Sequence, residues 1–141
     1  MFDYMMTKEQ IKVRDEARDL VKWVPRQMIL DMDTDKIKFP KEFPQEAGRR
    51  NLLGRRYPEK LGGRDMDWVT TCMIMEEIGT LGYEMACVFG VGAELVCDAI
   101  ILHGADGTKR KICKTAFKRS DFCGGMSDRT ARWFGFLWRN N

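Results

Sequence analysis

Residues 83–103 constrain the fold of this chain more than any other part of its sequence. They are apolar nearly all round and are followed by Gly104, which is typical of a helix C-terminus. A helix that is apolar on every side has to be surrounded by other elements, so we predict that this segment is the central helix. Gly90 and Gly92 lie inside it, and glycine costs about 1 kcal/mol relative to alanine in a helix. They therefore indicate a close approach, of a second helix or of a ligand.

Apart from an irregular stretch at residues 55–66, the rest of the chain before residue 120 has helical periodicity and no convincing strand pattern. Thr7 and Gln10 fit a capping box ahead of an apolar stripe, and Pro25 is expected to end or kink that helix. Further helices are expected over residues 39–53 with Gly54 as C-cap, from the N-cap Asp67 to Gly79, and over 106–117. The predicted fold is all-α, an orthogonal or up-down bundle of about five helices, followed by an extended segment from residue 121.

Composition narrows the classes of function. The chain has 141 residues, enough for one domain and too few for two. Its net charge of +3 is too small to indicate a nucleic-acid partner, and the basic run over 109–119 lacks an aromatic stacking platform. His103 is the only histidine and the five cysteines form no CxxC pair, which excludes a histidine-rich metal site and a disulfide framework. We predict no metal site and no nucleic-acid partner.

The sequence also indicates in which cellular compartment the protein is located. The N-terminus lacks the basic region of a signal peptide, and the most apolar run, residues 85–93, is far shorter than the roughly 20 residues that a membrane helix needs. An odd number of cysteines in apolar stretches favours a reducing compartment. We therefore expect a cytoplasmic protein without a membrane span.

Two pairs of carboxylates are candidates for chemistry. Glu76 and Glu77 are adjacent, so they point about 100° apart on a helix and are better interpreted as a solvated face. Glu94 and Asp98 lie one turn apart in the most apolar helix. At least one of these two is expected to be partly buried or to face a cleft, either as a functional group or as part of a structural network.

Several loose motifs occur in a specific order. They lie at residues 6–10 with 13–18, 39–42, 52–54, 57–63, 67 and 76–79, followed by the long apolar helix, a lysine-rich helix, and residues 122–128. In this order they resemble the N-terminal helical domain of acyl-CoA dehydrogenases. The resemblance covers residues 6–131, and it places a domain of this kind at 1–120 and the start of a middle β domain, with a divergent tail, at 121–141.

The resemblance implies an oxidoreductase of fatty acid metabolism that uses FAD to dehydrogenate an acyl-CoA thioester and passes electrons to an electron-transfer flavoprotein. The long helix would then line the acyl tail, through Phe89, Gly90 and Ala93. The strand before the middle domain would contact the flavin, through Gly124, Met126 and Ser127. The family's catalytic base generally lies in the C-terminal part of the enzyme, so no catalytic residue is expected in this chain.

The resemblance ends abruptly near residue 129. Arg132 and Trp133 stand where the family has small residues that allow a ligand to approach the backbone, and residues 133–141 no longer match. We expect a truncated or frame-shifted product that is inactive alone. The alternatives are a helical interaction module, acting as a homo-oligomer or with separately encoded domains, and a remnant without catalysis.

Overall fold

The structure is a computed structural model that describes residues 3–107, 109–110, 113 and 117, without the side chains at 92, 93 and 96. Every regular element in this part of the chain is helical, which confirms the predicted all-α class. The α-helices are α1 (Lys8–Trp23), α2 (Arg26–Asp33), α3 (Glu42–Arg49), α4 (Trp68–Gly79), α5 (Tyr83–Gly90) and α6 (Val96–His103). The shorter elements are the 3₁₀ turns η1 (Asp3–Met5) and η2 (Glu59–Leu61) and the π-helical turn η3 (Val91–Leu95).

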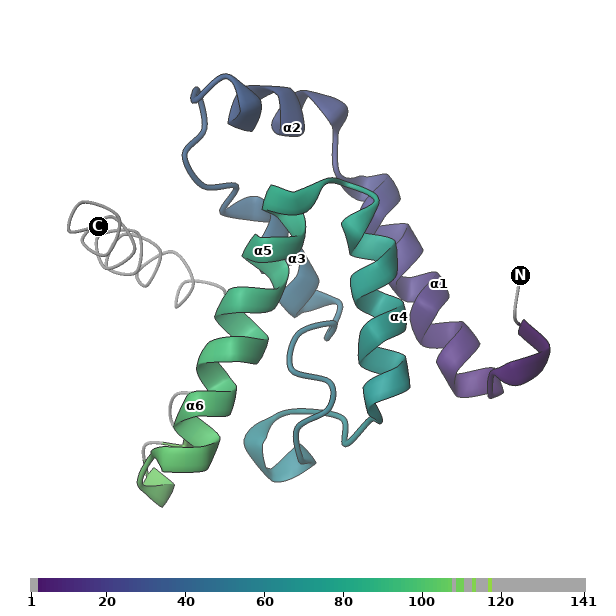
Figure 1. The fold of residues 1–141 in the computed structure, drawn as a ribbon, viewed down its shortest axis with the longest axis vertical. Coiled ribbons are helices and arrows are strands. Elements are labelled where there is room, and N and C mark those ends of the chain that lie inside the picture. Colours follow the sequence, from purple (N-terminus) through teal and green to yellow (C-terminus); the bar gives the residue numbers. More distant parts are fainter. Residues whose placement is uncertain (1–2, 108, 111–112, 114–116, 118–141) are drawn as a thin grey trace, which may run out of the picture.

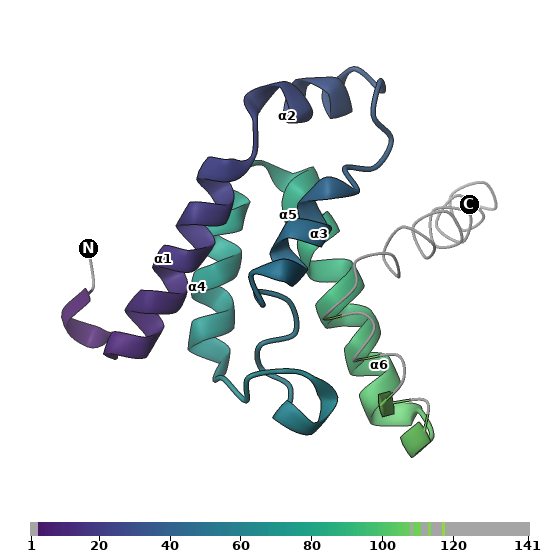
Figure 2. The ribbon, with the colours of Figure 1, turned by 180° about the vertical axis from the view of Figure 1, so that it is seen from behind.

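The helices form a bundle built around α4 and α5. Figure 1 shows α1 beside α4, and α5, η3 and α6 running as one rod in the opposite direction to α4. Seen from behind in Figure 2, α3 packs against α5, while α2 lies across one end of the bundle. The rod formed by α5, η3 and α6 coincides with the predicted central helix, but a π turn interrupts its regular winding.

Local sequence signals explain most helix boundaries. Thr7 Oγ1 accepts a hydrogen bond from the Gln10 amide at 3.2 Å, and Gln10 Oε1 accepts one from the Thr7 amide at 2.9 Å, which completes the predicted capping box. Pro25 separates α1 from α2, because proline cannot continue the hydrogen-bond ladder of a helix. Asp67 caps α4 through a 2.7 Å bond from the Thr70 amide to its carboxylate.

Both predicted ends of the helix expected over residues 39–53 were wrong, and its first residue is Glu42. Helix α3 ends at Arg49 rather than at Leu53, because Asn51 adopts a left-handed backbone with φ 54° that a helix cannot accommodate. Gly54 does have a left-handed backbone, with φ 63°, but it belongs to the loop that follows. A Cβ at that glycine would lie 2.2 Å from the ring of Phe117, so the loop backbone and that ring pack directly together.

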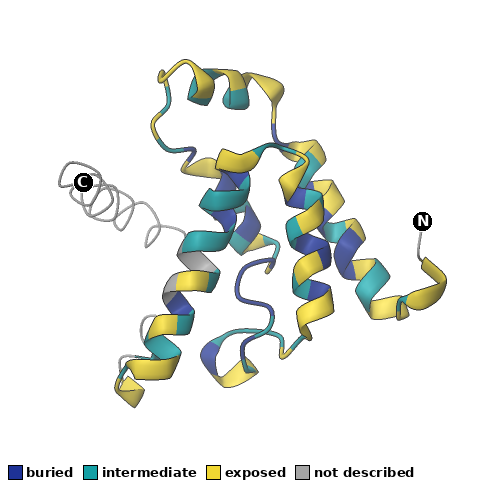
Figure 3. Ribbon diagram, in the orientation of Figure 1, coloured by how far each residue is buried: buried dark blue, intermediate teal, exposed yellow. Residues whose placement is uncertain are grey.

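The core lies between α1, α3, α4 and the long rod. Figure 3 shows buried positions concentrated on the facing sides of these helices, while α2 has exposed and intermediate positions and no buried residue. The buried apolar side chains include Val13, Ala17, Leu20, Phe43, Ala47, Leu52, Leu53, Ile74, Ile78, Met85, Phe89 and Cys97. The helix predicted over 106–117 lies largely outside the described residues, as does the whole of the extended segment predicted from 121. The domain boundary at residue 120 therefore remains a prediction.

Candidate functional site

A groove runs between α4 and the first half of the long rod. Its volume is about 470 Å³, which lies within the range of small-molecule sites. Most of the wall is apolar or weakly polar, and charged groups gather at one end. The lining residues are Arg56, Trp68, Thr71, Cys72, Met75, Tyr83, Ala86, Cys87, Gly90, Val91, Glu94, Leu95 and Asp98.

Arg56 joins the two carboxylates at the charged end of the groove. Its Nε donates to Glu94 Oε2 at 2.8 Å, and its Nη2 donates to Asp98. The guanidinium also lies over two rings, with Cζ 4.2 Å from the centroid of Trp68 and 4.5 Å from that of Tyr57. With 13% of its side chain exposed, this arginine is held by charge on two sides and by aromatic faces on two others.

Tyr57 adds two hydrogen bonds to the same network. Its hydroxyl lies 2.9 Å from Asp98 Oδ1 and 2.8 Å from the backbone carbonyl oxygen of Glu94, and can donate to either. That carbonyl belongs to the π turn, where one additional residue per turn disturbs the regular helical ladder. Such turns occur frequently at functional sites. Here the turn brings Glu94, and Asp98 four residues later, to the groove.

Burial controls the titration of two of these groups. Burial raises the pKa of Glu94 above its ordinary value of 4.5, although the hydrogen bond from Arg56 partly opposes the shift. Burial also raises the pKa of Tyr57, and its hydrogen bond with Asp98 acts in the same direction. The prediction that Glu94 or Asp98 would be partly buried or face a cleft is confirmed, because both line the groove.

The groove contains only part of the predicted acyl-binding set. Gly90 lies in its wall, and a Cβ there would be 3.2 Å from the Met75 methyl group, so the two helices approach closely. Phe89 is 3% exposed and packs in the core against Phe43, with ring centroids 6.3 Å apart. The backbone of Ala93 lies in the π turn, and its side chain is outside the described part.

The predicted flavin contacts Gly124, Met126 and Ser127 are all beyond the described residues. Among the described lining residues Arg56 alone is a cation, and Glu94 and Asp98 already engage it, so this lining does not suit the phosphate groups of FAD. Its apolar wall is suited instead to a hydrocarbon chain. Arg56, Tyr57 and Trp68 complete the charged end of the groove, although the sequence predicts no site residues in the loop from 55 to 66.

A second cleft, of about 700 Å³, lies at the far end of α6. Its lining combines charged and apolar side chains and comprises Pro58, Lys60, Leu61, Ile101, Asp106, Lys109 and Arg110. Lys109 is already paired with Asp106 at 3.6 Å. This cleft fits an apolar ligand less well than the groove beside α5 does, because burying charged groups against hydrocarbon is costly.

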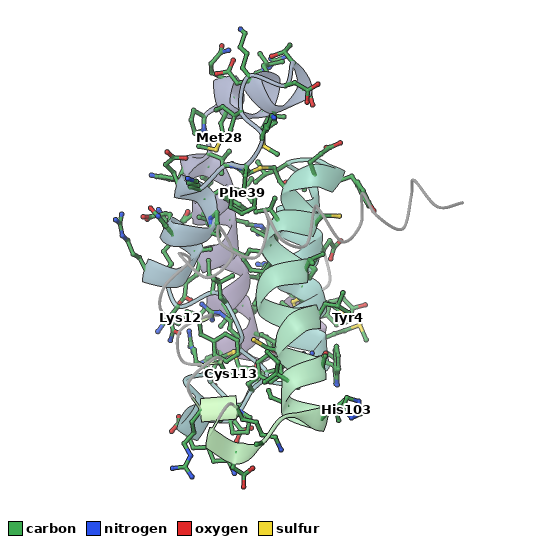
Figure 4. The ribbon with its side chains drawn as sticks, turned by 90° about the vertical axis from the view of Figure 1, so that its left-hand side faces the viewer. Tyr4, Lys12, Met28, Phe39, His103 and Cys113 are labelled. Atoms are coloured by element: carbon green, nitrogen blue, oxygen red, sulfur yellow. The ribbon has the colours of Figure 1, made fainter. Side chains whose placement is uncertain are left out.

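The described part of the chain contains neither a candidate membrane span nor a candidate metal site. No helix there is both long and apolar enough to cross a membrane. Nor does that part bring together three or more histidine, cysteine or acidic side chains that could hold a metal ion. His103 points outward at the end of α6 (Figure 4) and is exposed.

Comparison with known proteins agrees with this fold. Residues 7–118 match the acyl-CoA dehydrogenase N-terminal domain family, and the chain belongs to that family. It is 29% identical over 83 residues to mitochondrial isovaleryl-CoA dehydrogenase of Solanum tuberosum, a match that covers 55% of this chain and 20% of that protein. It is 26% identical over 108 residues to an acyl-CoA dehydrogenase of Bacillus subtilis (strain 168), over 75% of this chain and 28% of that protein. The chain thus spans little more than a quarter of these relatives at most.

Proposed function

We propose that this chain forms one wall of the acyl-binding site of an FAD-dependent acyl-CoA dehydrogenase. The observation that carries the proposal is the apolar groove between α4 and α5, in a domain of this family. Met75, Ala86 and Gly90 offer a wall of apolar atoms and close backbone approach to a hydrocarbon chain. Each methylene buried there contributes about 0.8 kcal/mol to binding.

The charged groups at one end of the groove determine where along the groove a hydrocarbon chain can bind. The carboxylates of Glu94 and Asp98 with the guanidinium of Arg56 cannot bury methylene groups without losing solvation. The acyl chain therefore lies along α5, between Tyr83 and Gly90, and stops short of the π turn. The role of these side chains is to bind and orient the acyl group and to exclude water from it.

FAD, when bound, supplies the redox chemistry of such enzymes by accepting a hydride from the acyl group. The proposed flavin contacts of this chain are Gly124, Met126 and Ser127, and the proposed electron acceptor is an electron-transfer flavoprotein. The chain spans 20% and 28% of the two relatives, so the remaining parts of the site come from further domains. We therefore expect no turnover from the 141 residues alone.

The compartment is proposed with the function. We propose that the protein is cytoplasmic, because the cysteine pattern of the sequence favours a reducing compartment. The potato relative is named a mitochondrial protein, and imaging of a tagged chain in its native cells distinguishes the two compartments.

A second candidate function is a helical assembly module without catalysis. The observation that favours it is the exposure of large apolar side chains along the groove, with Trp68 at 65%, Tyr83 at 80% and Leu95 at 64%. As a homo-oligomer or with separately encoded domains, the chain would cover this surface. Sedimentation over a range of concentrations distinguishes a self-associating module from a monomer.

The acyl-binding function is tested by calorimetric titration with octanoyl-CoA and with free CoA. We expect the wild-type chain to bind octanoyl-CoA more tightly than free CoA. The variant Gly90→Leu, whose side chain fills the groove, should reduce that preference at least about tenfold, which is equivalent to about two buried methylene groups. Gly79→Leu is the matched control, because no atom lies within 4 Å of a Cβ at that glycine. Equal affinity of the wild-type chain for both ligands would contradict the proposal.

A further inference from the structure

The second cleft, at the far end of α6, differs from the groove in the charge of its lining. Among the described residues that line it are three cations, Lys60, Lys109 and Arg110, and one acid, Asp106, which leaves two positive charges in excess. Its volume of about 700 Å³ lies within the range of small-molecule sites. Such a concave site attracts anions, because its low-dielectric walls focus the field of the lining charges.

The three cations come from two segments that are distant in the sequence. Lys60 belongs to η2, whereas the other two follow α6, and Figure 1 shows η2 and the C-terminal end of α6 at the same end of the molecule. Backbone hydrogen bonds order both segments. The Leu61 amide donates to the carbonyl oxygen of Pro58 at 2.9 Å, and the Lys109 amide donates to that of Ala105 at 2.9 Å. The cations therefore converge on the cleft from two hydrogen-bonded turns.

These cations are available to an anion that enters the cleft. Within the described part of the chain, neither Lys60 nor Arg110 forms an ion pair, and both side chains are exposed. Lys109 pairs with Asp106 at 3.6 Å, but Asp106 is 88% exposed, so water and salt weaken this contact. A phosphate group carries about two negative charges and can therefore compete with this single carboxylate for Lys109.

Apolar side chains complete the described lining of the cleft. Pro58, Leu61 and Ile101 all contribute to it, and Leu61 is only 7% exposed, so it is held in place by the core beneath. An inorganic anion would leave this apolar surface uncovered. An organic phosphate would cover it with its ring or hydrocarbon part, and the volume of the cleft suits a ligand of nucleotide size.

We propose that this cleft binds an organic phosphate of nucleotide size, with its phosphate oxygens on Lys60, Lys109 and Arg110 and its apolar part on Leu61 and Ile101. The lysines act as point charges, whereas the planar guanidinium can donate two parallel hydrogen bonds to one phosphate. This inference does not rest on the acyl-binding function, because the described linings of the cleft and the groove have no residue in common.

The test is calorimetric titration of the full chain with ADP, and with adenosine as the ligand that lacks phosphate. We expect adenosine to bind at least about tenfold more weakly than ADP, because it offers no anion to the cations. Lys60→Gln/Arg110→Gln removes the two cations without an acidic partner in the described part of the chain, at exposed positions where the fold should persist. This variant should lose at least about tenfold in affinity for ADP.

A matched control separates the cleft from the net charge of the chain. Lys22→Gln/Arg49→Gln removes the same two charges from side chains that are 75% and 76% exposed and lie outside the cleft lining. We expect it to bind ADP with wild-type affinity, and circular dichroism establishes that each variant is folded. Free CoA, which contains an adenosine diphosphate unit, is titrated in parallel. Binding of ADP alone indicates a free nucleotide as the ligand, and binding of both indicates that the cleft also takes the nucleotide unit of a larger molecule.

Each outcome decides the proposal. Weaker ADP binding by the cleft variant alone supports it, and higher salt should then reduce the wild-type affinity as well. Equal losses in the cleft variant and the control would overturn it, because net charge rather than the cleft would then attract the nucleotide. Absence of ADP binding, or equal affinity of the wild type for ADP and adenosine, would also overturn it.

Discussion

At the scale of single residues, Arg56 is the group that makes two neighbouring carboxylates compatible with an apolar groove. Glu94 and Asp98 lie one helical turn apart, where like charges repel, and the guanidinium bridges them while resting on Trp68 and Tyr57. Removing one partner from a nearly buried ion pair leaves the other charge unsolvated, which costs more than the pair itself contributes.

Replacing this arginine is therefore expected to destabilise the fold. Arg56→Ala should lower the free energy of unfolding by about 3 kcal/mol, because two acids lose their partner and two rings lose a packing surface. Urea denaturation monitored by circular dichroism measures the change. Arg49→Ala is the control, since Arg49 is 76% exposed and its pair with Glu46 is a surface contact expected to contribute less than about 1 kcal/mol. A similar small loss in both variants would contradict this role of Arg56.

The contribution of Glu94 to the stability of the fold depends on pH, and the direction of its pKa shift determines the sign of that dependence. Burial raises its pKa in the folded chain, so the folded state holds this proton more tightly than the unfolded state does. Its contribution to stability is therefore greatest at or below the ordinary value of 4.5 and is lost as the pH rises through the raised folded pKa. We expect the stability of the wild type relative to Glu94→Gln to decrease across that window. A relative stability that rises with pH over the same window would contradict this assignment.

At the scale of elements, the helices follow signals that act within a few residues. The capping box at Thr7, the break at Pro25 and the cap at Asp67 are all local, which is why the sequence predicts them correctly. The end of α3 was misplaced because the left-handed backbone at Asn51 has no comparably strong sequence signal. The length of the long rod was predicted, but its π turn was not, because hydrophobic periodicity does not report a single additional residue.

The charged end of the groove shows why the site was harder to predict than the fold. Arg56 and Tyr57 meet Glu94 and Asp98 across separations of 37 to 42 residues, so no helical or strand period connects them. The sequence contains only an indirect signal for this contact. Two acids in an apolar helix require a cation, and the arginines at 55 and 56, between apolar residues of a loop, are candidates to supply it.

The start of α4 provides a prediction at this scale, because this helix forms one wall of the groove. Asp67→Ala removes the N-cap and should cost about 1 kcal/mol in thermal or urea unfolding. Hydrogen bonds from Thr70 lower the pKa of Asp67, so its contribution is lost as the pH falls through that lowered pKa. Asp19→Ala, at an exposed position of α1, is expected to change stability by no more than about 0.5 kcal/mol. Equal effects of the two variants would contradict the capping role.

At the scale of the whole molecule, a helical domain of the acyl-CoA dehydrogenase family presents an apolar groove beside its longest helical rod. The groove also exposes large apolar side chains, as expected of a surface that another molecule or domain covers. A charged cleft lies at the far end of α6, so the groove and this cleft, both in the described part of the chain, offer a ligand distinct chemistry.

Photo-crosslinking distinguishes these two places most directly. An octanoyl-CoA analogue with a diazirine at the acyl terminus is bound to the full chain and irradiated, and the labelled peptides are mapped by mass spectrometry. The account predicts labelling of the groove wall, on peptides that contain Met75, Cys87 or Gly90, and its suppression by excess octanoyl-CoA but not by free CoA. Labelling concentrated on the cleft that contains Lys60 and Lys109, or labelling that free CoA suppresses equally, would contradict it.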